Sequence, residues 1–238
     1  CTGVGKCRAD LQATGGVMCP SFVATREEKD STRGRARVLQ EMLAPGGPVT
    51  GWRSPEVHEA LDLCLSCKGC SADCPVGVDV AAYKSEFLHH YYRGRLRPAS
   101  HYSMGWLPML ARLASRAPRL VNRVTASRLA PVLKRAGGIA AEREIPRFAD
   151  GTFLEWFRRR VPDGSGSRGP VLLWVDSFNN HFSPDVLIAG VEVLESAGYR
   201  VTVPPGVQCC GLTWISTGQL DAAKRIVGGT VEALRPAA

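Results

Sequence analysis

Four cysteines lie together in one short segment of the sequence, Cys64-Leu-Ser-Cys67-Lys-Gly-Cys70-Ser-Ala-Asp-Cys74-Pro75. The spacing C-x2-C-x2-C-x3-C-P is typical of loops that bind a cubane iron–sulfur cluster. Three thiolates separated by two residues each can reach three different irons. Gly69 is expected to adopt backbone conformations closed to other residues, and Pro75 favours an extended backbone at Cys74. The sequence therefore predicts an iron–sulfur centre here.

Two other uses of these cysteines fit the pattern less well. Structural zinc sites favour two Cys-x-x-Cys pairs separated by a longer loop, rather than three evenly spaced cysteines and a Cys-Pro. A complete disulfide framework needs an even number of cysteines, whereas this chain has nine among 238 residues. Iron–sulfur binding is therefore the preferred interpretation of the stretch.

An earlier group of cysteines repeats the same pattern. Adding 63 to the residue number takes Cys1 to Cys64, Val4 to Cys67 and Cys7 to Cys70. Cys19-Pro20 then corresponds to Cys74-Pro75, with eight extra residues in the last interval of the first copy. The first group is thus interpreted as an internal duplicate in which Val4 replaces the central cysteine.

The two groups predict two clusters with crossed ligands. In two-cluster ferredoxins the fourth cysteine of each run binds the other cluster. Applied to this chain, the rule predicts one complete site with four thiolates and one site with three. The complete site comprises Cys64, Cys67, Cys70 and Cys19, and the three-thiolate site comprises Cys1, Cys7 and Cys74.

Val4 decides which cluster the three-thiolate site is expected to hold. An apolar side chain cannot bind iron, and this segment resembles the three-iron motif of the succinate dehydrogenase iron–sulfur subunit, which has the same substitution. The prediction is [4Fe–4S] at the complete site and [3Fe–4S] at the other. Two alternatives remain at the second site: a [4Fe–4S] cluster with a non-cysteine ligand, or no cluster. Histidine candidates for such a ligand are His58, His89, His90 and His101, although surface or core packing is the commoner role of a lone histidine.

Helix signals surround the cysteines. Ser31 is expected to cap a helix that runs to about Leu43, and Ser54-Pro55 starts a helix that leads into the second cysteine group. Asp79 can cap a third helix. These elements predict an α-helical two-cluster ferredoxin domain over residues 1–98.

A helical connector is expected over residues 99–162, because proline punctuates an apolar and basic sequence there. Trp106 and Trp156 are candidates for a quinone-lining surface, with packing in the core or against a partner as the alternative. Residues 163–169, rich in Gly and Ser, predict a flexible linker.

The last part of the chain, residues 170–238, predicts a partial α/β domain. The expected elements are a strand over Val171–Val175, a helix from Ser183 through Ala197, a strand over Arg200–Val203 and a helix over about Ser216–Leu234. A strand–helix–strand unit with a short connection implies a parallel pair. Cys209-Cys210 would follow the carboxyl end of a strand, where sites gather in open α/β sheets. The predicted fold class is therefore mainly α.

Composition excludes several classes of protein. The hydrophobic fraction of 45% excludes a disordered chain. The sequence has no apolar run long enough for a membrane span, so no transmembrane segment is predicted. The formal charge is +8, but the arginines are dispersed. Those at Arg33–Arg37 are expected on solvated helix faces, and the alternative is that they tune the cluster potentials or contact an acidic partner. No nucleic-acid motif accompanies them, so no nucleic-acid partner is expected. Because the chain starts at Cys1 rather than Met, we expect it to be part of something longer.

Three segments resemble the iron–sulfur half of large FAD-linked oxidases, whose relatives include glycolate oxidase, D-lactate dehydrogenase and D-2-hydroxyglutarate dehydrogenase. The segments are CTGVGKCRADLQATGGVMCPSFVATREEKDSTRGRARVLQEML (residues 1–43), LDLCLSCKGCSADCPVGVDVAAYKSEFLHHYYRGRLRP (61–98), and LLWVDSFNNHFSP (172–184) with the later Cys-Cys-Gly. The last segment resembles the CCG domain that also occurs in heterodisulfide reductases.

The CCG pattern is incomplete in this chain. Asp176 stands where the family has an earlier cysteine, 33 residues before Cys209, and the later Cys-x-x-Cys is absent. Cys209 and Cys210 are therefore expected to be residual ligands, a redox pair or half of a site completed elsewhere. The alternative is that they are two small apolar turn residues.

The resemblance implies an oxidoreductase component that transfers electrons. An FAD domain, in the same polypeptide or a partner subunit, would oxidise a 2-hydroxy acid, and the two clusters would pass single electrons to a quinone, cytochrome or flavoprotein acceptor. A fragment of this kind would not oxidise the substrate alone. The alternatives are a subunit of a heterodisulfide-reductase-like or succinate/fumarate-type complex, and a zinc- or cluster-stabilised module that binds nucleic acid. The expected location is the cytoplasm, with peripheral attachment to a membrane left open.

Overall fold

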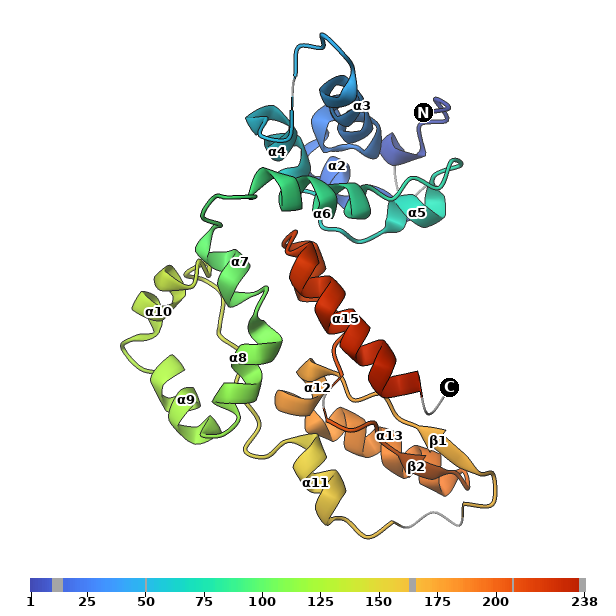
Figure 1. Cartoon of the computed structure of the whole chain (residues 1–238), viewed down its shortest axis with the longest axis vertical. Helices are drawn as coiled ribbons and strands as arrows, with labels where there is room; N and C mark the ends of the chain where they lie inside the picture. The colour runs from blue at the N-terminus through green and yellow to red at the C-terminus, as the bar shows by residue number, and fades with distance from the viewer. Residues whose placement is uncertain (10–14, 50, 163–165, 207, 236–238) are drawn as a thin grey trace. The chain divides into compact units, whose positions relative to one another are not determined.

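A computed structural model describes residues 1–9, 15–49, 51–162, 166–206 and 208–235 (Figure 1). Helices make up most of the described structure, and the described strands form one small parallel sheet. The mainly α class predicted from the sequence is therefore confirmed. The chain divides into two compact units: unit 1 is Cys1–Leu96 with Ile215–Leu220, and unit 2 is Arg97–Trp214 with Asp221–Ala238.

Unit 1 is built from short helices around the cysteine groups. These are η1 (Lys6–Arg8), α2 (Pro20–Thr25), η2 (Glu28–Asp30), α3 (Thr32–Leu43), α4 (Pro55–Asp62), α5 (Gly69–Asp73) and α6 (Val80–Tyr91). The three predicted caps are confirmed: Ser31 accepts from the Gly34 amide, Ser54 from Val57 and Asp79 from Ala82. Each cap satisfies an amide that the first helical turn leaves free.

The core of unit 1 contains both apolar side chains and cysteines. Val57 and Phe87 are fully buried between α4 and α6, and Cys7, Cys19 and Cys70 belong to the same cluster of buried residues. Ile215–Leu220 returns to this unit, where a Cβ added to Gly218 would lie 2.4 Å from the Leu88 Cβ. The cysteine groups therefore lie on a packed helical scaffold.

Unit 2 contains the remaining elements. These are α7 (Ala99–Ser103), α8 (Leu107–Ala114), α9 (Pro118–Thr125), α10 (Ala130–Ala136), α11 (Phe153–Arg159), β1 (Pro170–Leu172), α12 (Ser177–His181), α13 (Pro184–Ser196), β2 (Arg200–Thr202), α14 (Leu212–Ser216) and α15 (Leu220–Leu234), the last two running from one unit into the other. β1 and β2 pair in parallel, with Val171 opposite Val201. The core of this unit comprises Phe153, Leu154, Val175, Leu187, Val191 and Val201.

Two predicted elements of this region need correction, and two short helices were not predicted. The first strand ends at Leu172 instead of Val175, because only residues 170–172 pair with β2. The last predicted helix begins at Leu220 instead of Ser216, because Gly218 takes a left-handed φ of 66° between α15 and a short helix, α14, that the sequence did not indicate. A short helix that the sequence did not indicate, α12, begins after Asp176, whose carboxylate accepts from the Phe178 and Asn179 amides.

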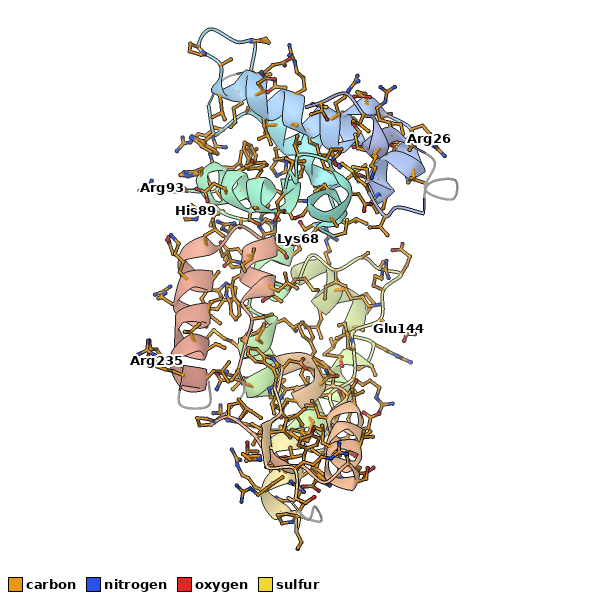
Figure 2. All side chains as sticks on the ribbon, turned by 90° about the vertical axis from the view of Figure 1, so that its right-hand side faces the viewer. Arg26, Lys68, His89, Arg93, Glu144 and Arg235 are labelled. Carbon is orange, nitrogen blue, oxygen red and sulfur yellow. The ribbon has the colours of Figure 1, made fainter. Side chains whose placement is uncertain are left out.

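The predicted linker at 163–169 falls partly outside the described residues, which resume at 166. The tryptophans of the connector differ in their surroundings. Trp156 packs against the core of unit 2 and lies 5.7 Å from the Phe153 ring centroid, whereas Trp106 precedes α8 and is 37% exposed. The side chains of Arg26, Arg93 and Arg235 are exposed (Figure 2).

Candidate iron–sulfur sites

Four cysteines from two distant parts of the sequence line one cavity of unit 1. We call it the four-cysteine cavity; its thiols are those of Cys19, Cys64, Cys67 and Cys70. Cys19 immediately precedes α2, and the other three lie in the loop between α4 and α5 or at the start of α5. This is the set that the spacing of the cysteines predicts for a complete cluster.

Left-handed backbone conformations shape the walls of this cavity. Cys19, Ser66 and Lys68 have φ values of 55°, 54° and 59°, which cost of order 1–3 kcal/mol each for residues other than glycine. The role expected for Gly69 was wrong, because its φ is not positive. A Cβ on Gly69 would instead lie 3.1 Å from Val17 Cγ2, so this glycine allows the loop to pack closely on the first cysteine group.

Two helix N-termini donate to the sulfurs of the four-cysteine cavity. The Thr32 amide donates to Cys19 Sγ at 2.9 Å, and the Thr32 hydroxyl lies 2.7 Å from the same sulfur. The Val80 amide donates to Cys70 Sγ at 3.4 Å. Thr32 and Val80 are the first residues of α3 and α6, where amides are free and the helix dipole favours negative charge. This environment favours thiolates.

Burial opposes ionisation of the free thiols. It raises the pKa of Cys19, against the hydrogen bonds from Thr32 and the charge of Arg35, and it raises the pKa of Cys70. Burial also lowers the pKa of Lys84, whose Nζ donates to the carbonyl oxygens of Asp62 and Cys64 at 2.9 and 2.8 Å. Metal ions bind thiolates and release these protons, so iron would compete with protons for the two buried sulfurs.

The donor set of the four-cysteine cavity fits an iron–sulfur cluster. Its walls contain four thiols and no carboxylate or imidazole among the described residues. All cysteines of the chain are free thiols. The free space is about 20 Å³, close to what a single water needs, and one of the four thiols, that of Cys67, belongs to an exposed residue.

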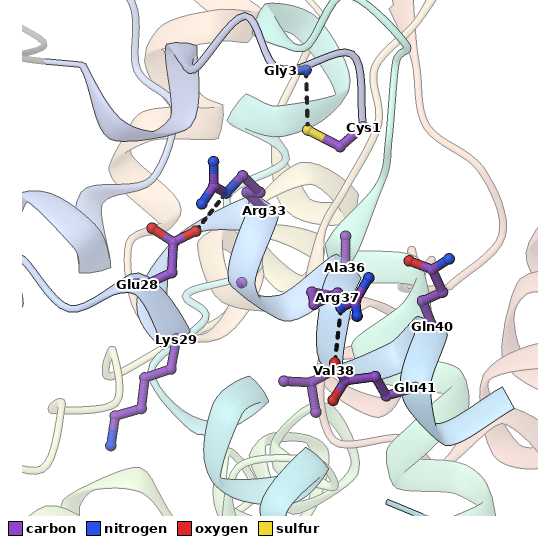
Figure 3. A pocket seen from close by; sticks show the side chains of 11 residues that line it. Cys1, Gly3, Glu28, Lys29, Arg33, Ala36, Arg37, Val38, Gln40 and Glu41 are labelled. Atoms are coloured by element: carbon purple, nitrogen blue, oxygen red, sulfur yellow. Dashed lines mark hydrogen bonds and ion pairs between the residues drawn. The ribbon is translucent and has the colours of Figure 1, made fainter. Parts of the chain in front are cut away.

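The remaining three cysteines of unit 1 line a second cavity, of about 80 Å³. We call it the three-cysteine cavity; its thiols are those of Cys1, Cys7 and Cys74. Val4 also lines it, at the position where the second copy of the motif has a cysteine. Cys1 lies beside a groove of about 940 Å³ along α3, and its Sγ accepts from the Gly3 amide at 3.4 Å (Figure 3).

No histidine, aspartate or glutamate lines the three-cysteine cavity in the part of the chain that the structure describes. None of the four candidate histidines lines this cavity in the described structure. His58 stacks on Tyr91 with ring centroids 4.6 Å apart, and His90 pairs with Glu86 at 3.0 Å. Within the described ranges, no group of three or more His, Cys, Asp or Glu side chains is placed to hold a single metal ion, so the thiols surround their cavities without converging on one point.

Thr32 lines both cavities, which makes the two sites direct neighbours. Sequence reasoning missed this residue. It also did not single out Arg35 among the arginines of Arg33–Arg37, although Arg35 lines the four-cysteine cavity. The expectation of solvated arginines is correct for Arg33 and Arg37, which are exposed and pair with Glu28 and Glu41. It is wrong for Arg35, whose side chain is 2% exposed.

Cys209 and Cys210 lie in unit 2, whereas the other seven cysteines lie in unit 1. Cys209 is buried, and its amide donates to Thr230 Oγ1 at 3.3 Å, while Cys210 is exposed. Cys209 lines a cavity of about 190 Å³ that contains no second cysteine among the described residues. The Gln208 amide donates to the Val175 carbonyl at 3.3 Å, so the residue before the pair is bound to the segment that follows β1.

Comparisons with known proteins bear on the whole arrangement. Residues 1–78 match the family described as a 4Fe-4S dicluster domain. The chain is 28% identical over 230 residues to D-2-hydroxyglutarate dehydrogenase of Pseudomonas putida, a match that covers 79% of this chain and 23% of that protein. It is 22% identical over 238 residues to the probable glycolate oxidase iron-sulfur subunit of Bacillus subtilis (90% of this chain, 51% of that protein). It is 29% identical over 116 residues to one subunit of the anaerobic glycerol-3-phosphate dehydrogenase of Escherichia coli (48% and 29%). No solved structure matches the chain.

These findings indicate the class of protein: residues 1–78 match an iron–sulfur dicluster domain, and the chain is related to oxidoreductases and their iron–sulfur subunits. More particularly, it is related to the iron–sulfur portion of FAD-linked oxidases, and the resemblance seen in its sequence is confirmed. The chain spans about a quarter of the length of the Pseudomonas relative. Among the described residues, no helix has the length and apolar character needed to cross a membrane.

Proposed function

We propose that this chain carries single electrons from an FAD-containing dehydrogenase domain to a downstream acceptor through two adjacent iron–sulfur sites. The observation that carries the proposal is the composition of the two cavities. The four-cysteine cavity takes three thiols from the second cysteine group and Cys19 from the first, and the three-cysteine cavity takes Cys74 from the second group. Crossed ligation of this kind is the arrangement of two-cluster ferredoxins.

A cluster in either site would supply one-electron redox chemistry. The protein contributes three things to it. Amides at the starts of α3 and α6 stabilise negative charge on Cys19 and Cys70. Burial of Cys7, Cys19 and Cys70 in the core keeps water from these thiols. Thr32, shared by both cavities, keeps the two sites within one side chain of each other.

The second site is proposed to hold a three-iron cluster. Val4 occupies the position of the central ligand, and the cavity has no other ligand of the usual kinds among the described residues. An iron at that corner would have no protein ligand from the described wall, which supports [3Fe–4S] over [4Fe–4S].

The FAD and the substrate belong to a different part of the enzyme in this proposal. The related proteins are D-2-hydroxyglutarate dehydrogenase and a probable glycolate oxidase subunit, so the proposed substrate class is 2-hydroxy acids. A flavin takes up two electrons from such a substrate, and the iron–sulfur sites would pass them singly to a quinone, cytochrome or flavoprotein.

The division of labour along the chain is also part of the proposal. Residues 1–98 would hold the clusters, residues 99–162 would connect, and residues 170–238 would form the partial CCG domain with Cys209 and Cys210. The burial of Cys209, next to a residue that is bound to the segment after β1, supports a role for this thiol as a remnant of a ligand set.

Analysis of the anaerobically reconstituted chain tests the proposal. Iron and acid-labile sulfide are measured first, and EPR spectra are then recorded on the oxidised and the dithionite-reduced protein. We expect about seven irons per chain, a three-iron signal in the oxidised state and a four-iron signal in the reduced state. Stoichiometric zinc without sulfide would overturn the proposal.

A further inference from the structure

Arg35 is a buried cation in the wall of the four-cysteine cavity. Its side chain is 2% exposed, and its donors reach three different elements. Nε donates to the Ala60 carbonyl at 2.8 Å, and Nη1 donates to Ser21 Oγ at 2.9 Å. Nη2 lies 3.6 Å from Asp30 Oδ1, which is an ion pair but too long for a hydrogen bond.

One donor and one acceptor of this buried pair have no hydrogen-bond partner, namely Arg35 Nη2 and Asp30 Oδ1. A guanidinium is always charged, and leaving a buried donor unsatisfied costs about 1–3 kcal/mol or more for a charged group. A pair that served only to hold the helices together would be expected to close this gap. The open donor instead suits an anionic group in the cavity that Arg35 lines.

The other charged groups around the cavity do not replace Arg35. Lys68 also lines it, but this side chain is 60% exposed and pairs with Asp79 at 2.6 Å. Lys84 is directed to backbone carbonyls, one of them that of Cys64. Asp30 is not among the residues that line the cavity, so Arg35 is the member of the pair that belongs to the cavity wall.

Thiolates and bound sulfide make an iron–sulfur cluster anionic, and each added electron increases that charge. Net charge and hydrogen bonds to the sulfurs set the reduction potential. A buried cation favours the reduced state more than the oxidised state, and low solvent access strengthens this effect. Asp30 would act in the opposite direction from behind Arg35.

We propose that Arg35, from the wall of the four-cysteine cavity, uses its open donor Nη2 to interact with the sulfur ligands and raises the reduction potential there, with Asp30 limiting the increase. The inference rests on the proposed function, since it requires a cluster on Cys19 and the Cys64–Cys70 loop. In this proposal the unpartnered Nη2 of Arg35 serves to set the reduction potential of the cluster.

Opposite charge changes at the same pair test the inference. Asp30→Asn removes the negative charge and keeps an oxygen for the hydrogen bond from Thr25 Oγ1, which is 2.8 Å long. Arg35→Gln removes the positive charge, and Arg35→Lys keeps it. The matched control is Arg37→Gln, which removes a charge from the same helix at a side chain that is 68% exposed.

The readouts are iron and sulfide content and the midpoint potential from an EPR-monitored titration of the four-iron signal. We expect Asp30→Asn to raise the potential and Arg35→Gln to lower it, each by at least a tenfold change in the one-electron equilibrium, or about 59 mV. Arg35→Lys should shift it less than Arg35→Gln, and Arg37→Gln should leave it unchanged because solvent screens that charge.

A structural role alone would reduce cluster content in both variants and would not move the potential in opposite directions. If the Arg35 variants lose their iron, Asp30→Asn still decides: an increased potential supports the inference, and an unchanged one overturns it. Unsubstituted chain without sulfide-bound iron would overturn the proposed function and the inference together, whereas unchanged potentials in iron-containing variants overturn the inference alone.

Discussion

The replacement of Gly34 by alanine is a direct test of how closely α3 packs on the preceding turn. A Cβ at this position would lie 2.0 Å from the Glu28 carbonyl oxygen, 2.8 Å from its carbon and 3.0 Å from Lys29 Cα. All three atoms belong to the backbone of η2, so no flexible side chain can yield. The turn and the helix must therefore separate until the shortest distance reaches ordinary contact, at 3.4 Å or more.

The energetic cost follows from what this separation breaks. Overpacking of this kind costs about 1–3 kcal/mol. The same movement disrupts the cap, in which Ser31 Oγ accepts from the Gly34 amide and donates to the Glu28 carbonyl, worth about 1 kcal/mol. The higher helix propensity of alanine offsets about 1 kcal/mol of this loss in the free energy of unfolding. With the overpacking cost taken at the upper end of its range, we expect Gly34→Ala to lower the free energy of unfolding by a net amount of about 3 kcal/mol.

The assay is urea unfolding of the reconstituted chain, followed by circular dichroism, together with iron content. Gly190→Ala is the matched control, because this glycine is also inside a helix, α13, but nothing lies within 4 Å of the added Cβ. The control should raise the free energy of unfolding by about 0.5–1 kcal/mol. Because Thr32 and its bonds to Cys19 follow the cap, Gly34→Ala should also lose iron. A variant as stable as the unsubstituted chain, with full iron content, would contradict the close packing of α3 on η2.

Three further predictions concern single side chains. Thr32→Val removes the hydroxyl that lies 2.7 Å from Cys19 Sγ but keeps the hydrogen bond from the Thr32 amide. Because a hydrogen bond to a charged group is stronger than one between neutral groups by about 1 kcal/mol, the midpoint potential should fall by about 45 mV at unchanged iron content. An unchanged or increased potential would contradict this. Val4→Cys supplies the central ligand of the three-cysteine cavity, so the three-iron EPR signal of the oxidised protein should disappear and the iron content should increase by about one iron per chain. Persistence of that signal would contradict the role given to Val4. Burial and the charge of Arg112 lower the pKa of His181 below its usual 6.5, so the unfolded chain binds the proton more readily and the free energy of unfolding should fall as the pH drops below about 6.5. His181→Gln should reduce this pH dependence, measured by urea unfolding at about pH 7 and pH 5. An equal pH dependence in both proteins would contradict this role of His181.

Local signals in the sequence predicted much of unit 1. The caps Ser31, Ser54 and Asp79 were predictable because each begins a helix through contacts within three residues. The grouping of the thiols was also predictable, since the spacing of the cysteines limits which of them share a loop. The cavities match those groups, although the ligand assignment itself stays a prediction.

Contacts between distant segments account for what the sequence did not indicate. Arg35 is one of several arginines in a basic stretch, and only the arrival of Ser21, Asp30 and Ala60 around it makes it a buried cation. Gly69 is a glycine because Val17 lies against it, a contact between two separate cysteine groups that no local pattern records. The strand pairing also depends on a partner, so β1 stops where β2 stops.

The central claim is that each site draws its last thiolate from the other cysteine group. EPR spectra of Cys19→Ser and Cys74→Ser, compared with the unsubstituted chain, test it most directly. We predict that Cys19→Ser loses or strongly alters the four-iron signal of the reduced protein and keeps the three-iron signal of the oxidised protein, and that Cys74→Ser does the reverse. If Cys74→Ser instead affected the four-iron signal and Cys19→Ser the three-iron signal, each group would bind its own cluster, and the crossed arrangement would be wrong.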